Sequence, residues 1–302
     1  VFSSFGSSPG LSEGSSGFSV LPPWLGGRTS IFESHEFAQQ RVENIKNRDT
    51  IIFFMAIIVT SRIDINLSYP TCDAYDTPIP MSKNMIFWYS GCGDSKFVAE
   101  QIAQATGESM GFIPDLQREG FDHYEIAQGE SVGFVFPVYA WGDPPLVEAF
   151  VSWVKWSGKA SYVWFACTCG DEMGYTYRSF GDILRGAGLE LDACFCFQMP
   201  ETYLCYPGFH LDTKEGAQKK IDATKAKLPS VIEAIRSRSK VVDQIVGGMP
   251  ALKSGLIRKG FIRFMSDKKY HVTDACTGCG VCQKKCPLHN IEMVQGKPKW
   301  KG

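Results

Sequence analysis

The residues Asn84-Met-Ile-Phe-Trp-Tyr-Ser90, followed by Gly91-Cys-Gly-Asp-Ser95, set the pattern for most of this 302-residue chain. The first run is mostly apolar and predicts a buried β-strand, and the second has the glycines of a tight turn. Helical spacing of apolar side chains follows, at Phe97, Val98, Ile102 and Ala105, and Gly107 ends it. A strand, a loop and a helix in this order begin an α/β fold.

The alternation of strand and helix patterns continues along the chain. We expect further strands over residues 111–114, 131–136, 162–167 and 189–199, and helices over residues 146–154, 177–187 and 213–238. Strands that alternate with helices pair in parallel through right-handed crossovers, and the helices cover both faces of the sheet. The sequence therefore predicts an α/β domain over residues 81–239, with a five-stranded, doubly wound parallel sheet.

Residues 1–80 differ from the rest in composition. Residues 1–30 contain nine Ser, six Gly and three Pro but only two charged residues, which is too little apolar surface to offset the entropy of ordering. We expect residues 1–80 to be a low-complexity or extraneous segment, mostly unstructured, with the ordered pattern starting at Met81. The longest apolar run, Ile51–Val59, has nine residues, whereas a membrane span needs roughly 20. We therefore expect no membrane span.

Charge and cysteine content limit the classes of function. The formal net charge is −1, which excludes wholesale electrostatic binding of nucleic acid. Residues 81–239 carry −6 and residues 240–302 carry +8, so a basic linker over residues 240–270 follows an acidic domain. Eleven cysteines, four of them crowded into residues 276–286, indicate metal ligands in a reducing compartment, and hence a cytoplasmic protein.

The most specific motif is Cys276-Thr-Gly-Cys279-Gly-Val-Cys282-Gln-Lys-Lys-Cys286-Pro287. Its C-x2-C-x2-C-x3-C-P spacing is that of bacterial iron–sulfur ligation, and Gly278 and Gly280 allow the backbone to wrap closely around a cluster. A zinc site is the alternative, but zinc ribbons use two separated C-x2-C pairs. We expect a 4Fe-4S cluster in a small ferredoxin-like domain over residues 271–302, with the ligands Cys276, Cys279, Cys282 and Cys286.

Only one such cysteine run is present. In two-cluster ferredoxins the fourth Cys of a run ligates the other cluster, so Cys286 either completes a single cluster or needs a partner run. We expect the partner run to lie beyond residue 302 and the ferredoxin-like domain to be truncated in this chain.

A phosphate site is predicted in the loop Ser90–Ser95. Backbone N–H groups in such a turn form a nest for an anion, and the positive end of the following helix adds to it. An ordinary strand–helix turn, with Asp94 or Ser95 as the helix cap, is the alternative.

Two further loops are predicted to lie beside this one, because the carboxyl ends of parallel strands meet at one edge of the sheet. The loop after the third strand carries Tyr139 and Trp141, whose rings can stack on a planar ligand. The loop after the fourth strand carries Gly170 and Gly174, which allow a ligand to approach the backbone closely. Together the three loops predict a site for a phosphate attached to a planar ring.

At these residues the chain resembles the flavodoxin-like family, and with residues 271–302 it is similar to the bacterial flavodoxin–ferredoxin fusion proteins found mainly in anaerobes. The second loop has the family pattern Pro-x-Tyr-x-x-Gly-x-Pro, at Pro137, Tyr139, Gly142 and Pro144. The first loop has Cys92 and Asp94 where the family usually has Thr and Asn. The resemblance implies the sheet order 2-1-3-4-5. It also implies FMN, with phosphate contacts from Ser90, Cys92, Gly93, Asp94 and Ser95 and ring contacts from Tyr139, Trp141 and Gly170.

We expect an electron-transfer protein that relays electrons between FMN and the 4Fe-4S cluster, with redox proteins as its partners. An electron carrier is favoured over a substrate-specific oxidoreductase. No Ser-His-Asp or nucleophile-elbow pattern appears, so hydrolysis has no support. The basic linker either docks the cluster domain against acidic surface or only solubilises the chain.

Two other functions stay open. Asp94 places a carboxylate near a phosphate dianion, where like charges disfavour binding, and the chain is then a flavin-less 4Fe-4S carrier or docking module. Alternatively, Cys92 lies at a helix N-terminus, where thiol pKa values fall, and meets Cys167 and Cys169 in a thiol-based redox sensor. Cys194 and Cys196 fall on a strand and are expected to fill the core.

Overall fold

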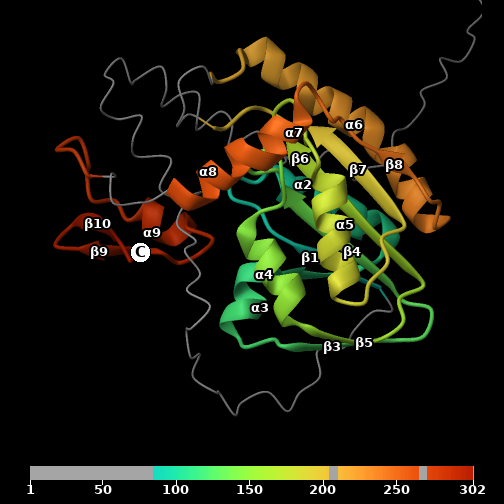
Figure 1. The fold of residues 1–302 in the computed structure, drawn as a ribbon. Helices are drawn as coiled ribbons and strands as arrows, with labels where there is room; N and C mark the ends of the chain where they lie inside the picture. The colour runs from blue at the N-terminus through green and yellow to red at the C-terminus, as the bar shows by residue number, and fades with distance from the viewer. Residues whose placement is uncertain (1–83, 204–209, 265–270, 302) are drawn as a thin grey trace, which may run out of the picture.

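The computed structural model describes residues 84–203, 210–264 and 271–301. Its centre is a six-stranded sheet in the order β2-β1-β4-β6-β7-β8 (Figure 1), and every neighbouring pair is parallel. Residues 1–80, for which we expect mostly no fixed structure, lie outside the described residues. The strands of the sheet are β1 (Asn84–Trp88), β2 (Ser109–Phe112), β4 (Ser131–Pro137), β6 (Tyr162–Cys169), β7 (Ala193–Gln198) and β8 (Val242–Asp243).

Helices cover both faces of this sheet, as Figure 1 shows. Residues of β6 are buried at every position, as expected for a parallel strand enclosed on both sides. One face packs against α2 (Asp94–Thr106) and α6 (Lys214–Arg236). The other face packs against α3 (Ile113–Arg118), α4 (Pro145–Trp153) and α5 (Thr176–Gly186). The chain is therefore an α/β fold with a parallel sheet between two helical layers.

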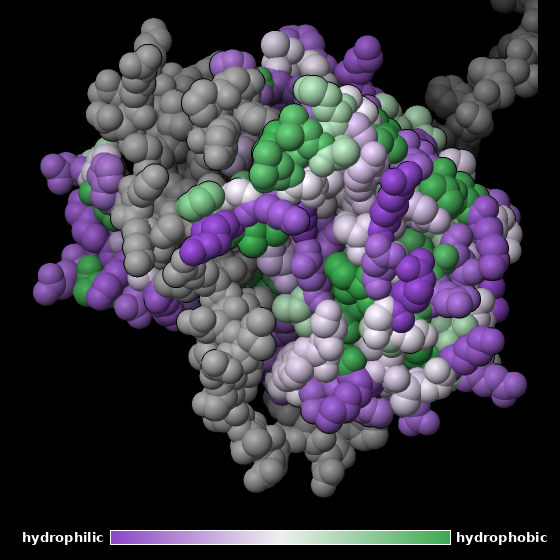
Figure 2. Space-filling model, in the orientation of Figure 1, coloured by the Kyte–Doolittle hydropathy of each residue, from purple (hydrophilic) through white to green (hydrophobic). Residues whose placement is uncertain are grey.

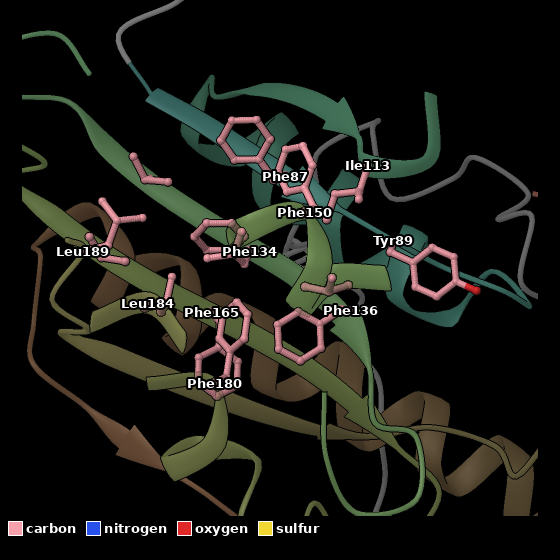
Figure 3. Packing of buried hydrophobic residues seen from close by; sticks show 14 of the residues in the cluster. Phe87, Tyr89, Ile113, Phe134, Phe136, Phe150, Phe165, Phe180, Leu184 and Leu189 are labelled. Atoms are coloured by element: carbon pink, nitrogen blue, oxygen red, sulfur yellow. The ribbon is translucent and has the colours of Figure 1, made fainter. Parts of the chain in front are cut away.

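Aromatic rings fill the layer between the sheet and α3, α4 and α5 (Figure 3). The ring of Phe87 on β1 lies 5.7 Å from that of Phe134 on β4 and 5.3 Å from that of Phe150 on α4. Phe180 on α5 lies 5.3 Å from Phe165 on β6. Aromatic side chains bury large areas each, so this layer fixes the ends of the strands from which the candidate site is built.

The sheet has six strands where five were expected, so its full order differs: β2-β1-β4-β6-β7 follow the expected order 2-1-3-4-5, and a further strand is added at the edge. A sixth strand, β8, pairs with β7 through Cys194 and Phe195 and extends the sheet by one strand. β8 is only two residues long, which is too short for an apolar periodicity to reveal. The strand expected over residues 111–114 is β2, which begins at Ser109 and ends at Phe112. It ends there because Ile113 and Pro114 already belong to α3.

Residues 240–264, expected as part of a linker, contain β8 and a helical segment. This segment comprises α7 (Pro250–Leu252), the π-helical turn η4 (Lys253–Ile257) and α8 (Arg258–Phe264). Figure 1 shows it leading from the sheet towards the C-terminal elements, and Figure 2 shows hydrophobic surface where α7 lies. The remaining elements are the parallel pair β3 (His123–Ile126) and β5 (Lys155–Gly158), the helix α9 (Val281–Lys285) and the antiparallel pair β9 (Ile291–Val294) and β10 (Lys297–Trp300).

Across the described residues, none of the helices combines the length and the hydropathy needed to cross a membrane.

Candidate functional site

The loop between β1 and α2 has the backbone of an anion cradle. Gly93 caps α2 with a φ of 111°, a left-handed conformation that suits glycine. Its N–H donates to Oγ of Ser90 at 3.0 Å. The first amides of the 13-residue helix α2 follow this loop directly, and the positive end of the helix dipole lies there. A glycine-capped loop that leads into a helix N-terminus is an arrangement at which proteins bind phosphate.

Ser95 does not face this cradle, contrary to the expected phosphate contact. Its side chain is 0% exposed, and its Oγ lies 2.7 Å from Oγ1 of Thr168 on β6. A hydroxyl that is buried between the helix and the sheet does not contact a ligand in the loop. Ser95 therefore anchors α2 on β6 instead of contacting a phosphate.

Two carboxylates lie at the cradle, and sequence reasoning identified only one of them. Burial raises the pKa of Asp94 to about 7, and the nearby carboxylate of Glu201 adds to this rise. Glu201 follows β7 and lies over Gly170, where an added Cβ would be 2.0 Å from its Oε2. Burial also raises the pKa of Glu201. The charge of the cradle therefore suits a phosphate only when Asp94 is protonated.

The thiol of Cys92 does not have the lowered pKa expected at a helix N-terminus. Desolvation followed by the charge of Asp94 raises its pKa, although Cys92 as a whole is exposed to solvent. Cys167 and Cys169, expected on a neighbouring loop, are residues of β6 and are buried. Sγ of Cys169 lies 3.5 Å from Sγ of Cys196. The expected sensor that unites Cys92 with Cys167 and Cys169 thus lacks its activated thiol.

Tyr139 and Trp141 lie on the loop after β4, at the same edge of the sheet. The hydroxyls of Tyr139 and Tyr89 are 3.2 Å apart. Nε1 of Trp141 donates to Oε1 of Glu172 at 2.9 Å, and Nζ of Lys253 lies 5.3 Å from the centroid of the Trp141 ring. Both aromatic side chains are therefore held in place by polar partners before any ligand binds.

Arg258 of α8 is inserted beneath this loop. The residue is only 8% exposed, and its guanidinium donates to the backbone carbonyl oxygens of Tyr139 at 2.8 Å and Asp143 at 2.5 Å. It also pairs with the carboxylate of Glu148. A side chain at Gly142 would collide with it, since an added Cβ would lie 2.4 Å from Cζ of Arg258.

Two basic residues of the segment expected as a linker form ion pairs within the chain. Arg258 pairs with Glu148, and Lys253 pairs with Glu172. Both acidic partners belong to the sheet domain. Lys268 and Lys269, which are part of the same expectation, lie outside the described residues.

The cysteine run carries the four residues predicted to ligate an iron–sulfur cluster. Cys286 is buried, and the backbone N–H of Asn290 donates to its sulfur at 3.3 Å. Gly278 has a φ of 70°, and an added Cβ there would lie 2.7 Å from the carbonyl oxygen of Gly296, so only glycine fits this tight wrap. Burial raises the pKa of Cys282, and the charges of Cys276 and Cys279 add to it. Among the residues that the structure describes, however, no three or more such side chains are gathered around a point that suits a metal ion.

The cysteine run also touches the sheet domain. Leu288 packs against the hydrophobic core, and Nε2 of His289 lies 4.0 Å from Oδ1 of Asp115 on α3. Burial raises the pKa of Tyr89 to about 12, and the thiols of Cys92 and Cys286 both add to this rise. Tyr89 therefore lies within electrostatic reach of both the anion cradle and the last cysteine of the run.

Comparison with known proteins gives weak likenesses. No protein-family model and no curated protein matches the chain. A structure of Trp repressor binding protein from Bacillus subtilis has 14% identity and a TM-score of 0.30, and the match covers 48% of this chain and 95% of that one. An NAD(P)H:quinone oxidoreductase from Methanothermobacter marburgensis has 12% identity and a TM-score of 0.31, over 49% and 94% of the two chains. The Flv1 flavodiiron core from Synechocystis sp. PCC6803 has 11% identity and a TM-score of 0.27, over 50% of this chain and 36% of that one. Likenesses at this level establish neither a family nor an activity.

Proposed function

We propose that this chain is a cytoplasmic electron-transfer protein of the flavodoxin–ferredoxin fusion type, which relays electrons between FMN and a 4Fe-4S cluster and passes them to redox partner proteins. The observation that carries the proposal is the run of Cys276, Cys279, Cys282 and Cys286, whose spacing is that of iron–sulfur ligation. A flavin exchanges electrons in pairs or singly and a 4Fe-4S cluster exchanges them singly, so the two together connect two-electron and one-electron partners.

FMN is proposed at the carboxyl edge of the sheet. The phosphate would be held by Ser90, Cys92, Gly93 and Asp94, with Asp94 in its protonated form. Tyr139 and Trp141 supply ring surfaces that are already fixed by Tyr89, Glu172 and Lys253. A ring contact at Gly170 requires the carboxylate of Glu201 to move aside, because it lies against that glycine.

The 4Fe-4S cluster is proposed on the four cysteines of the run. The amide of Asn290 that donates to Cys286 is a hydrogen bond of the kind that tunes such clusters. Leu288, two residues after Cys286, packs against the core of the sheet domain, which supports transfer within one chain. Tyr89 bonds to Tyr139 at the proposed flavin site.

FMN affinity is expected to fall as pH rises through about 7, because Asp94 ionises there and its carboxylate repels the phosphate. In Asp94→Asn this repulsion is removed, and FMN should bind about tenfold more tightly than to the wild type at a pH well above 7, since two charges about 4 Å apart interact by about 1–4 kcal/mol at the protein surface. The phosphate of FMN ionises near pH 6 in both proteins, so the variants are compared above that pH.

The measurement is a flavin fluorescence titration of the full chain, with Asp182→Asn on the exposed surface of α5 as the control. The control should bind FMN as the wild type does. Equal affinities of wild type and Asp94→Asn above pH 7 would contradict the proposed phosphate site.

A flavin-less cluster carrier is the second candidate, and the pair of Asp94 and Glu201 at the cradle favours it. The same titration separates the two functions. If neither the wild type nor Asp94→Asn binds FMN at any pH, the sheet edge is not a flavin site and the carrier function is the better account.

A further inference from the structure

Four cysteines outside the iron–sulfur run lie together on the neighbouring strands β6 and β7, which are side by side in Figure 1. The strand register places Cys167 directly beside Cys196. All four side chains belong to the same side of the core, since residues two apart on a strand face the same way. The four are Cys167, Cys169, Cys194 and Cys196.

Within this group, the sulfurs of Cys169 and Cys196 are 3.5 Å apart. Within the described ranges, no three metal-binding side chains are arranged around a common point. Cys194 instead points its sulfur at the carbonyl oxygen of Asp243, 3.7 Å away. Sγ of Cys167 lies 4.0 Å from Sδ of Met173. Cys169 and Cys196 thus form a pair of sulfurs in contact.

The surroundings of the pair favour a thiolate on Cys196 and a thiol on Cys169. The thiols of Cys167 and Cys169 point at Cys196 and lower its pKa, and the ammonium group of Lys227 lowers it further. Nζ of Lys227 also donates to the carbonyl oxygen of Cys196 at 2.6 Å. The hydrogen bond with Cys196 conversely raises the pKa of Cys169. Thiol–disulfide exchange proceeds by attack of a thiolate on a disulfide, and the thiolate of Cys196, 3.5 Å from Cys169, is placed to accept the thiol proton of Cys169.

We infer that Cys169 and Cys196 form a dithiol/disulfide redox centre that exchanges electrons with low-molecular-weight disulfides. Cys169 is 7% exposed and Cys196 is 0% exposed, so an incoming disulfide meets Cys169 first. Cys167 is also 0% exposed, which excludes it as the first point of attack. The centre needs neither cofactor, and Cys169 is the residue before Gly170 of the proposed flavin site.

The exchange balances in two steps. The thiol proton of Cys169 passes to the thiolate of Cys196. The sulfur of Cys169 then bonds to one sulfur of the small disulfide, forming a mixed disulfide, and the other small sulfur leaves as a thiolate. The sulfur of Cys196 attacks Cys169 in the mixed disulfide, and the second small thiolate leaves and takes the proton of Cys196. A thiol and a thiolate of the protein become one disulfide, the small disulfide becomes a thiol and a thiolate, and two electrons are transferred.

The test is equilibration of the folded full chain in mixtures of reduced and oxidised glutathione, followed by an acid quench, alkylation and peptide mass spectrometry. Cys167 and Cys169 lie on one tryptic peptide, because no Lys or Arg falls between Lys159 and Arg178. Fragmentation of the cross-linked peptides therefore has to locate each sulfur. Cross-links within the 276–286 run are scored separately.

The expected result is a cross-link between Cys169 and Cys196 that forms with increasing oxidised glutathione and disappears when dithiothreitol is added. Cys194→Ser, which removes a neighbouring thiol on the same face, should keep this cross-link, and Cys169→Ser should lack it. The wild-type result stands without the variants if either of them fails to fold. A cross-link of Cys196 to Cys167, or one that forms only in denaturant, would overturn the inference, as would two free thiols throughout in folded protein.

Discussion

Arg258→Met should lower the free energy of unfolding by about 3–5 kcal/mol, the usual cost of removing one partner from a buried ion pair. The guanidinium holds two backbone carbonyl oxygens and the carboxylate of Glu148. Asp143, which is 0% exposed, lies 3.8 Å from the same group. Methionine fills similar volume but leaves both carboxylates and both carbonyl oxygens without this donor. The loop that carries Tyr139 and Trp141 loses its support at the same time, so FMN affinity should fall as well.

The destabilisation should grow with pH. Burial, followed by the neighbouring Asp143, raises the pKa of Glu148 to about 8, and Arg258 partly offsets this rise. Because the folded state then holds a proton that the unfolded state has released, stability falls as pH rises between the ordinary Glu value and about 8. Without Arg258 the pKa of Glu148 rises further and the loss continues to higher pH.

Urea unfolding followed by circular dichroism measures both effects. Arg263→Met is the matched control, because Arg263 lies on the same helix with its side chain exposed, and it should change stability by less than about 0.5 kcal/mol. If Arg258→Met were no more destabilised than Arg263→Met, the buried ion pair would not support the fold.

Cys282→Ser should remove nearly all iron from the protein. The proposed cluster needs about four thiolates, and a serine hydroxyl is a poor substitute for a thiolate with iron. The fold of the sheet domain should be unaffected, because Cys282 lies in the C-terminal run. Iron and acid-labile sulfide are measured after anaerobic purification of the full chain.

Cys92→Ser is the control for this loss, since Cys92 lies in the proposed phosphate loop, and it should keep its iron. Equal iron in Cys282→Ser and Cys92→Ser would contradict cluster binding by the run. Cys286→Ser distinguishes the two roles left open for the fourth cysteine. It should lose iron if Cys286 completes the same cluster and keep it if Cys286 serves another.

Much of the sheet could be predicted from the sequence, because β1, β4, β6 and β7 are apolar runs enclosed by helices. β8 could not be predicted, since it has only two residues and is held by contacts with distant segments of the chain. Cys194 contacts the carbonyl oxygen of Asp243, and Lys227 of α6 pairs with the carboxylate of Asp243. Such contacts between distant segments leave no local pattern in the sequence.

The candidate site could be predicted only in outline. Parallel topology placed the loops of Gly93, Tyr139 and Gly170 at one edge, but the inward direction of Ser95 was missed. The helical spacing of the sequence predicts this inward direction, because Ser95 lies on the same face of α2 as the buried residues Val98, Ala99 and Ile102. Glu201 had no comparable signal, since its approach to Gly170 depends on where the chain turns after β7.

The most direct test of the proposed relay is the content of FMN, iron and sulfide in the full chain, purified without oxygen and supplied with FMN below pH 7. The proposal predicts about one FMN, about four iron and about four sulfide per chain in the same sample. Iron and sulfide without flavin would leave a cluster carrier in place of the relay. A protein that holds no iron would contradict the central claim outright.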